Sequence, residues 1–240
     1  MLKLLITAST ILFFRFASYG QSDTTIAYRY FQKGQHEYIV KKYKEAIAYY
    51  DSSATSNPQF NRLYFSRALA KYHAGDLQGS IDDYSISIEK NVQVSSSYDN
   101  RGYSKFVLGD NKGAMDDYNK SIELNPLNER AFVNRGGLNY RLKAYNEALS
   151  DFSKALFLNP KSTGIFYNSG LSKLALKDYK AAIGDFDNFL QAFPSNGSGW
   201  LMRGMAKLNI DDKLGACSDL QKASSLGNND AAEAIKEFCK

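Results

Sequence analysis

The chain of 240 residues repeats one pattern of residue types every 34 residues. An aromatic residue opens the pattern, and a small residue, glycine in five copies, follows four positions later. A second small residue lies 12 positions further on, and a bulky residue lies four positions after that. The opening aromatics are Tyr30, Tyr64, Tyr98, Phe132, Phe166 and Trp200. Six successive copies exclude a chance match and predict a repeat array rather than a single globular core.

Each repeat is counted from three residues before its aromatic, so that the aromatic occupies position 4. The six repeats are then 27–60, 61–94, 95–128, 129–162, 163–196 and 197–230. Helical spacing predicts two helices in each repeat, called helix A and helix B, separated by a break. We expect positions 4, 8 and 11 of helix A and positions 20, 21, 24 and 28 of helix B to face the core. Because glycine in a helix costs about 1 kcal/mol relative to alanine, its recurrence at position 8 predicts a close crossing of the two helices.

Two charged residues also recur in register, Asp at position 23 and Arg at position 7. The aspartates are Asp83, Asp117, Asp151, Asp185 and Asp219, and the arginines are Arg67, Arg101, Arg135 and Arg203. This recurrence favours a structural role for the carboxylates over acid–base catalysis. Pairing within a repeat leaves only Asp185, opposite Ser169, without an arginine, whereas pairing with the next repeat leaves more residues unmatched. We therefore predict Arg–carboxylate pairs within each repeat.

This pattern resembles the tetratricopeptide repeat family over residues 27–230. The resemblance implies an all-α solenoid of six helix-turn-helix repeats, wound into a right-handed superhelix with a concave groove. It further implies a non-catalytic scaffold that needs no cofactor and binds a peptide or a partner protein. After Asn228 the pattern changes, and residues 231–240 are predicted to form a helix that caps the exposed apolar end of the array.

In this family, positions 2, 5, 6, 9, 12 and 13 of helix A line the concave groove. The candidate groove residues here are Phe31, Phe65, Asn100, Tyr103, Arg130, Asn134, Tyr140, Tyr167 and Asn168. An asparagine at position 6 in three successive repeats can donate to and accept from an extended peptide backbone. The aromatics alternatively pack between neighbouring A helices. That interpretation is as good as exposure for position 12, whereas we favour exposure for positions 5 and 9.

Some family members hold the carboxylate end of chaperone tails with a set of Lys, Asn and Arg side chains in three successive repeats. Asn100 and Arg130 match two of those positions. Phe65, Leu69 and Asn134 depart from the set, so the resemblance favours a more apolar peptide ligand.

The first residues lie outside the repeats. Lys3 precedes an apolar stretch over residues 4–14, and small residues follow at 17, 18 and 20. This layout is typical of a secretory signal peptide, here residues 1–20, followed by a short lead over residues 21–26. An uncleaved N-terminal anchor is the alternative, although the apolar stretch is short for a membrane span.

Residues 216–239 resemble the closing segment of exported bacterial members of this family. Together with export, this resemblance implies a protein of the bacterial periplasm or cell envelope, or a secreted one. Its net charge is +5, and no run of Lys or Arg suggests nucleic acid as a partner. A scaffold for protein interactions is the first functional hypothesis. A dedicated chaperone or accessory subunit of an envelope secretion or polysaccharide-assembly system is the second. An enzyme is disfavoured, because His36 and His73 lie in different repeats and have no Cys or acidic residue at metal-ligand spacing.

Cys217 and Cys239 are the only cysteines of the chain. Cys217 occupies position 21, which should face the next element, here the capping helix. Cys239 lies four residues after Ile235, on the apolar face of that helix. Export into an oxidising compartment would join them in a disulfide, whereas two buried free thiols are the alternative.

Overall fold

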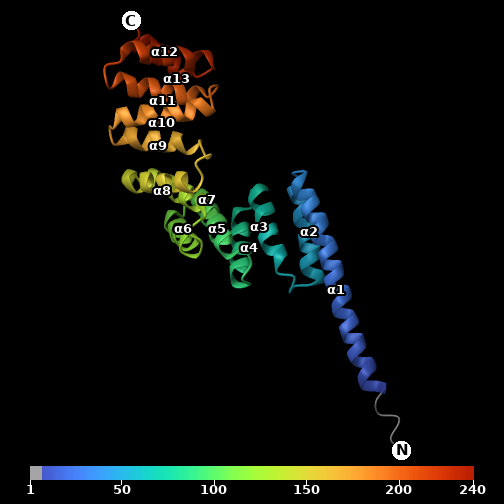
Figure 1. The fold of residues 1–240 in the computed structure, drawn as a ribbon. Helices are drawn as coiled ribbons and strands as arrows, with labels where there is room; N and C mark the ends of the chain where they lie inside the picture. The colour runs from blue at the N-terminus through green and yellow to red at the C-terminus, as the bar shows by residue number, and fades with distance from the viewer. Residues whose placement is uncertain (1–6) are drawn as a thin grey trace, which may run out of the picture. The chain divides into compact units, whose positions relative to one another are not determined.

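The computed structural model describes the backbone of residues 7–240 and the side chains from residue 23 onward (Figure 1). This part of the chain forms thirteen α-helices and no strand, which confirms the all-helical prediction. The helices are α1 (Thr7–Ile39), α2 (Tyr43–Ser56), α3 (Arg62–His73), α4 (Leu77–Glu89), α5 (Val94–Leu108), α6 (Asn111–Leu124), α7 (Glu129–Arg141), α8 (Tyr145–Leu158), α9 (Ile165–Ala175), α10 (Tyr179–Ala192), α11 (Gly197–Leu208), α12 (Lys213–Ser225) and α13 (Asn229–Phe238).

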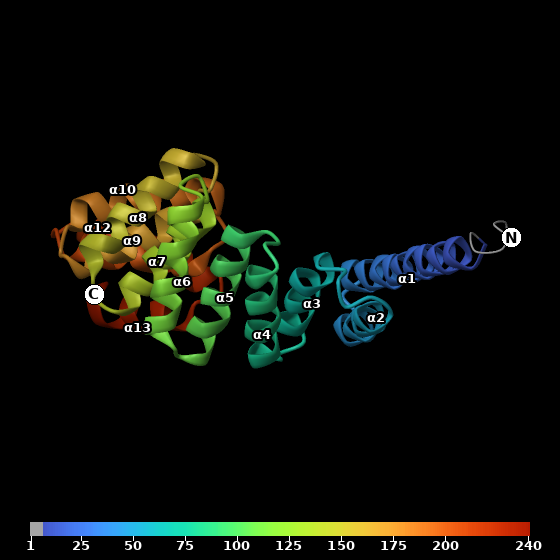
Figure 2. The same ribbon diagram turned by 90° about the horizontal axis from the view of Figure 1, so that it is seen from below.

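Odd-numbered helices up to α11 are the A helices of the six predicted repeats, and even-numbered helices are the B helices. The chain forms two units, residues 1–124 with α1–α6 and residues 125–240 with α7–α13. Within each unit, every helix packs against the next one along the chain, and the two views in Figures 1 and 2 show this succession.

The predicted signal peptide, residues 1–20, lies partly outside the described residues. Residues 7–20 belong to α1, which continues without a break into helix A of the first repeat. Among residues 7–240, no helix combines the length and the apolar character needed to cross a membrane.

In the second and third repeats, a left-handed glycine followed by a capping aspartate makes the break between helices A and B. Gly75 and Gly109 have φ of +87° and +88°, a conformation that costs glycine little. The next residues, Asp76 and Asp110, cap helices α4 and α6, because each side chain accepts a hydrogen bond from a backbone N–H three residues later at 2.8–2.9 Å. The turn therefore stops one helix and starts the next within three residues.

The small residue at position 8 allows helices A and B to cross closely, as the sequence predicts. A Cβ atom on Gly136 would lie 2.7 Å from the Phe152 ring, and one on Gly102 would lie 2.9 Å from the Tyr118 ring. Phe152 and Tyr118 are at most 1% exposed. Each glycine therefore makes room for the bulky residue at position 24 of its own repeat.

The predicted pairs between position 7 and position 23 form within each repeat. All four arginines donate two hydrogen bonds, from Nε and Nη2, to the two carboxylate oxygens of one aspartate. The Nη2–Oδ1 distances are 2.6–2.7 Å, and the aspartate side chains are 2–5% exposed. Hydrogen bonding to Asp219 raises the pKa of Arg203 above its usual value. These bidentate pairs fix the register of helix A against helix B.

Position 11 differs from the expectation of a core position, because four of its six residues are lysines. Their ammonium groups lie 2.7–2.9 Å from the same aspartates. In the fourth repeat, Asn139 takes this place and donates a hydrogen bond to Asp151 at 3.0 Å. The buried carboxylate thus has a second partner in the four repeats that also carry the arginine, which offsets the cost of its desolvation. In the fifth repeat Asp185 has the lysine but no arginine at position 7.

Three of the arginines also connect their repeat to the preceding one through Nη1. Arg67 donates to Asp51 at 2.7 Å, and Arg203 donates to Asp187 at 2.6 Å. Arg101 donates to Ser85 at 2.9 Å. One guanidinium therefore holds three successive helices together.

Installing the arginine that the fifth repeat lacks should stabilise the array. Ser169 occupies position 7, and Asp185 has Lys173 at 2.7 Å in a geometry outside that of a hydrogen bond. Ser169→Arg should raise the free energy of unfolding by about 1 kcal/mol, because a guanidinium group at this position can donate hydrogen bonds to both carboxylate oxygens of Asp185. Ser169→Lys adds the positive charge without a group that can donate to both oxygens. Its increase in the free energy of unfolding, measured with urea, should therefore be smaller. Equal effects of the two variants would contradict the bidentate explanation.

The outer face of α1 differs from the same face of the later A helices. Positions 3 and 10 are buried in repeats two to six, for example Leu63 and Ala70 at 0% exposure. In the first repeat these positions carry Arg29 and His36, and both are exposed. The polar substitution suits a first repeat whose outer face meets solvent rather than another helix pair.

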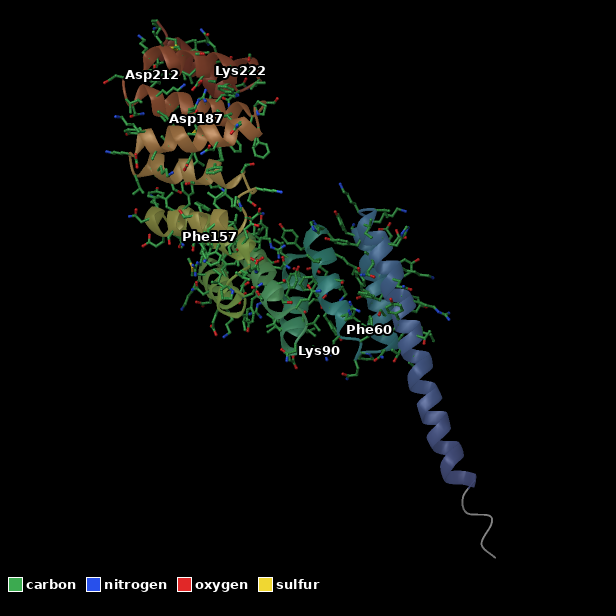
Figure 3. All side chains as sticks on the ribbon, in the orientation of Figure 1. Phe60, Lys90, Phe157, Asp187, Asp212 and Lys222 are labelled. Atoms are coloured by element: carbon green, nitrogen blue, oxygen red, sulfur yellow. A yellow bond between two sulfur atoms is a disulfide. The ribbon has the colours of Figure 1, made fainter. Side chains whose placement is uncertain are left out.

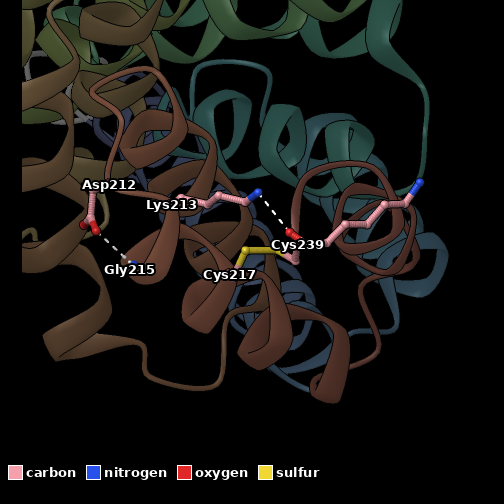
Figure 4. The surroundings of a disulfide bond; sticks show 6 residues. Asp212, Lys213, Gly215, Cys217 and Cys239 are labelled. Carbon is pink, nitrogen blue, oxygen red and sulfur yellow. Dashed lines mark hydrogen bonds between the residues drawn. A yellow bond between two sulfur atoms is a disulfide. The ribbon is translucent and has the colours of Figure 1, made fainter.

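Helix α13 closes the other end, as predicted for residues 231–240. Asn228 accepts a hydrogen bond from the Ala231 N–H at 3.0 Å and so caps the helix. Ala231 is fully buried, and Ile235 packs on the cluster formed by α11 and α12. Cys217 and Cys239 are joined by a disulfide with a Cα–Cα distance of 5.7 Å, the pairing that the sequence predicts (Figure 4).

Candidate functional site

A pocket opens in the first unit on the helix A face, where the family resemblance places a groove. It has a volume of about 210 Å³. Its lining residues are Gln35, Tyr38, Ile39, Tyr50, Ser66 and Leu69. These side chains come from α1 and α3 at positions 6, 9, 12 and 13, together with the position 24 ring of α2. The pocket therefore lies between the A helices of the first two repeats.

The pocket wall is uncharged and offers both apolar surface and hydroxyl groups. The Tyr50 ring is 1% exposed, and its hydroxyl is hydrogen-bonded to Ser66. Burial raises the pKa of Tyr50 to about 12. Tyr50 therefore stays neutral at physiological pH, and the pocket suits a neutral side chain better than an ionised one.

A continuous row of aromatic rings extends from this pocket across the first unit. We call it the aromatic strip, and it consists of Tyr38, Tyr43, Tyr72, His73, Tyr103 and Phe106. His73 stacks on Tyr43 with ring centroids 5.0 Å apart. The centroids of Tyr38 and Tyr72 lie 5.8 and 5.2 Å from the same imidazole. Tyr72 then contacts Tyr103 at 5.7 Å, and Tyr103 contacts Phe106 at 6.2 Å.

The strip combines packing with exposure. Tyr38 and Tyr72, both at position 12, are half-buried and contact rings of the next helix A. This arrangement agrees with the packing alternative for position 12. Tyr103, at position 9, is 38% exposed. Burial raises the pKa of the Tyr72 hydroxyl, and the neighbouring Tyr103 adds to the effect. The strip is therefore a preformed surface with its side chains already ordered.

The prediction of an exposed Phe31 is wrong. Phe31 is 5% exposed and contacts the rings of Tyr50 at 5.7 Å and Phe60 at 5.2 Å. Phe65, also at position 5, is half-buried with its ring edge toward Tyr84. Position 5 packs on the bulky position 24 residue of its own repeat, and this contact removes Phe31 from the accessible surface.

The other predicted groove residues fall in different units. Asn100 is half-buried on α5 in the first unit, and Asn134 and Asn168 are half-buried on α7 and α9 in the second. An asparagine ladder over all three repeats stays a prediction. Also in the second unit, Arg130 is exposed on α7.

Two tyrosines of the second unit pack beside the bulky residues of their own repeats. Tyr140 is half-buried and lies 5.6 Å from Tyr145. Tyr167 is half-buried against Phe186 at 6.0 Å and Phe189 at 5.1 Å. Part of each tyrosine surface stays accessible, as the groove prediction requires.

Asp99 is a residue of this region that sequence reasoning missed. It occupies position 5, where the other repeats carry an apolar or aromatic residue, and it is fully buried. Burial raises the pKa of Tyr118 far above its usual value, and the charge of Asp99 adds to the effect. The Tyr118 hydroxyl beneath the strip therefore stays protonated and neutral.

No group of three His, Cys, Asp or Glu side chains from residue 23 onward is arranged to hold a metal ion. The buried carboxylates of this part of the chain at position 23 are held by Arg, Lys or Asn partners, and they point toward the A–B contacts rather than into the pocket.

Paired helices that recur every 34 residues, closed by a capping helix, define a helical repeat protein. Residues 31–91 and 100–163, just over half of the chain, match the tetratricopeptide repeat family. The chain belongs to this family. No curated protein sequence matches it.

Solved structures show the same fold at low sequence identity. PilF of Pseudomonas aeruginosa superposes with a TM-score of 0.77 at 16% identity, over 90% of this chain and 99% of that one. Cut9 in its complex with Hcn1 gives 0.74 at 20% identity, over 89% of this chain and 43% of the other. YrrB, described as a repeat protein of this family with an unusual peptide-binding site, gives 0.67 at 18% identity, over 78% and 97% of the two chains.

Proposed function

We propose that this chain is a non-catalytic scaffold that binds an extended peptide, or an extended segment of a partner protein, on the helix A face of its first unit. The observation that carries the proposal is the uncharged pocket between α1 and α3, which is continuous through Tyr38 with the aromatic strip. Rigid aromatic side chains contribute contact area at a low entropic cost, as binding hot spots require. The peptide-binding site named for YrrB supports the same class of ligand.

We further propose that the protein acts after export, in the bacterial periplasm or cell envelope. The signal-like sequence of residues 1–20 and the disulfide between Cys217 and Cys239 support this setting, because disulfides persist in oxidising compartments. A dedicated chaperone or accessory subunit of an envelope system would use the same surface. Its test is whether one partner, encoded beside this protein, is lost from crosslinked complexes when the pocket is altered.

The proposal is tested by selecting binders from a library of random peptides against the full chain. Leu69 lines the pocket, so Leu69→Glu should weaken binding of the selected peptides about tenfold or more by placing a charge in an apolar wall. Thr55→Glu is the matched control, because Thr55 is exposed on α2 outside the pocket. Both variants should retain the helical circular dichroism spectrum of the parent.

Two results would contradict the proposal. One is the absence of any peptide that binds the folded chain. The other is a set of selected peptides whose affinity is the same for both variants, which would place the binding surface elsewhere.

A further inference from the structure

Resting on the peptide-binding function proposed above, we propose that the ligand segment is proline-rich and binds the aromatic strip as a polyproline II helix. The proposal names the chemical class of the ligand rather than a partner. It follows from the ring spacing, the charge and the hydrogen-bonding character of the strip and the pocket beside it.

The spacing of the rings suits a polyproline II helix. Neighbouring rings of the strip are 5.0–6.2 Å apart. This helix has three residues per turn and rises about 3.1 Å per residue, so residues on one face recur about every 9.3 Å, which is between one and two ring steps. Prolines three residues apart, which are rigid and apolar, can therefore each meet an aromatic face of the strip. Polyproline recognition in other folds relies on similar rows of aromatic side chains.

The strip and the pocket also match a ligand that has no charge. None of their residues is Lys, Arg, Asp or Glu, and burial holds the pKa of Tyr38, Tyr50 and Tyr72 above the usual value. An acidic or basic peptide would lose solvation of its charges here without gaining an opposite charge. A neutral proline-rich segment loses no such solvation.

The polar groups of this surface can donate hydrogen bonds to a ligand. Tyrosine hydroxyls and the Gln35 amide can donate to a carbonyl oxygen. A polyproline II backbone has no internal hydrogen bonds, and its prolines carry no N–H, so it presents carbonyl acceptors almost exclusively. An extended ligand of other composition would also present N–H groups, and the described helices offer no strand edge that would pair with both kinds of group.

Both partners of the proposed complex are ordered before binding. Tyr72 and Tyr103 are held by ring contacts with one another and with His73 and Phe106, and the ligand helix is stiff in the free state. Little conformational entropy is then lost on association. The pocket between α1 and α3 lies at one end of the strip and can accept a flanking apolar side chain.

The test measures fluorescence anisotropy of two labelled ten-residue probes, oligoproline and a Gly-Ser repeat, with the full chain. Oligoproline should bind about tenfold tighter or more than the Gly-Ser probe. Tyr103→Ala should weaken oligoproline binding about tenfold, and Tyr103→Phe should weaken it less because the ring remains. Phe157→Ala is the matched control, since Phe157 is a 77% exposed aromatic on α8 outside the strip. It should leave binding unchanged (Figure 3).

The outcomes separate this proposal from the function on which it rests. If oligoproline binds no tighter than the Gly-Ser probe, while library peptides bind and respond to Leu69→Glu, the proline-rich ligand is overturned and the scaffold function stands. If neither oligoproline nor any library peptide binds, both proposals fail. Oligoproline binding that is equally sensitive to Tyr103→Ala and Phe157→Ala would also overturn the assignment to the strip.

Discussion

Replacing Gly136 by leucine is expected to lower the free energy of unfolding by about 3 kcal/mol, at the upper end of the range for overpacking a core. The reason is the crossing of α7 and α8. A Cβ atom alone would lie 2.7 Å from Cε1 of Phe152 and 3.2 Å from Cβ of Asp151. Phe152 is fully buried and cannot swing away, so a larger side chain must separate the two helices. The shift of the urea unfolding midpoint measures the effect.

The neighbouring glycine is the matched control for this prediction. Gly137 lies on the same helix, and a Cβ atom there would meet nothing within 4 Å. Gly137→Ala should therefore raise stability, by up to about 1 kcal/mol, through helix propensity alone. If Gly136→Leu and Gly137→Ala shifted the midpoint in the same direction, the close crossing would not explain the recurring glycine at position 8.

The repeat register and its internal pairs could be predicted from the sequence, because they recur. The 34-residue period predicts where each pair of helices A and B lies in the sequence. Position 7 carries the arginine that binds Asp83 in one repeat and Asp219 in another. The start of α1 could not be predicted in this way. No proline separates residues 7–26 from the first repeat, and the helix continues through Gly20 and Ser22 although such residues favour turns.

The candidate site was harder to predict, because it depends on how neighbouring repeats differ. Positions 6, 9 and 12 were expected to face a groove, but the pattern does not say where space remains between two A helices. At position 9, Tyr103 reaches Tyr72 and fills the space between α3 and α5. The smaller Leu69 leaves the pocket between α1 and α3 open. Side-chain size at position 9 therefore decides where the pocket lies. Phe31 is covered for a different reason, the contacts of its ring with Tyr50 and Phe60.

Lysine at position 11 shows a limit of predicting core residues from hydropathy. Helical spacing placed this position on the core side, and its lysines do lie there, with side chains 18–25% exposed. Hydropathy alone would reject a charge at such a site. The aspartate at position 23 makes it favourable, because the ammonium group and the guanidinium share one buried carboxylate. The burial of the lysine at position 11 could therefore be predicted only by considering it together with the aspartate at position 23.

Loss of the disulfide is expected to destabilise the C-terminal end of the array by about 3 kcal/mol, from the loop of 22 residues that it closes. Helix α13 has ten residues, and Ala231 is its only fully buried side chain, so packing alone holds it weakly. The Cys217→Ala/Cys239→Ala variant should therefore lose hydrogen-exchange protection over residues 229–238, and its urea unfolding midpoint should fall. The contacts of α12 with α11 should keep the preceding repeats helical.

Reduction of the parent protein supplies the internal control. Dithiothreitol should reproduce the loss of protection in the parent and should leave the double alanine variant unchanged, because that variant has no bond to break. The Lys213 ammonium group, which donates to the Lys240 carbonyl at 3.0 Å beside the disulfide, is exposed and should not hold the helix by itself. Protection of α13 that is equal with and without the bond would show that Ala231 and Ile235 suffice to dock it. Two free thiols in the denatured, unreduced protein would show that the bond does not form.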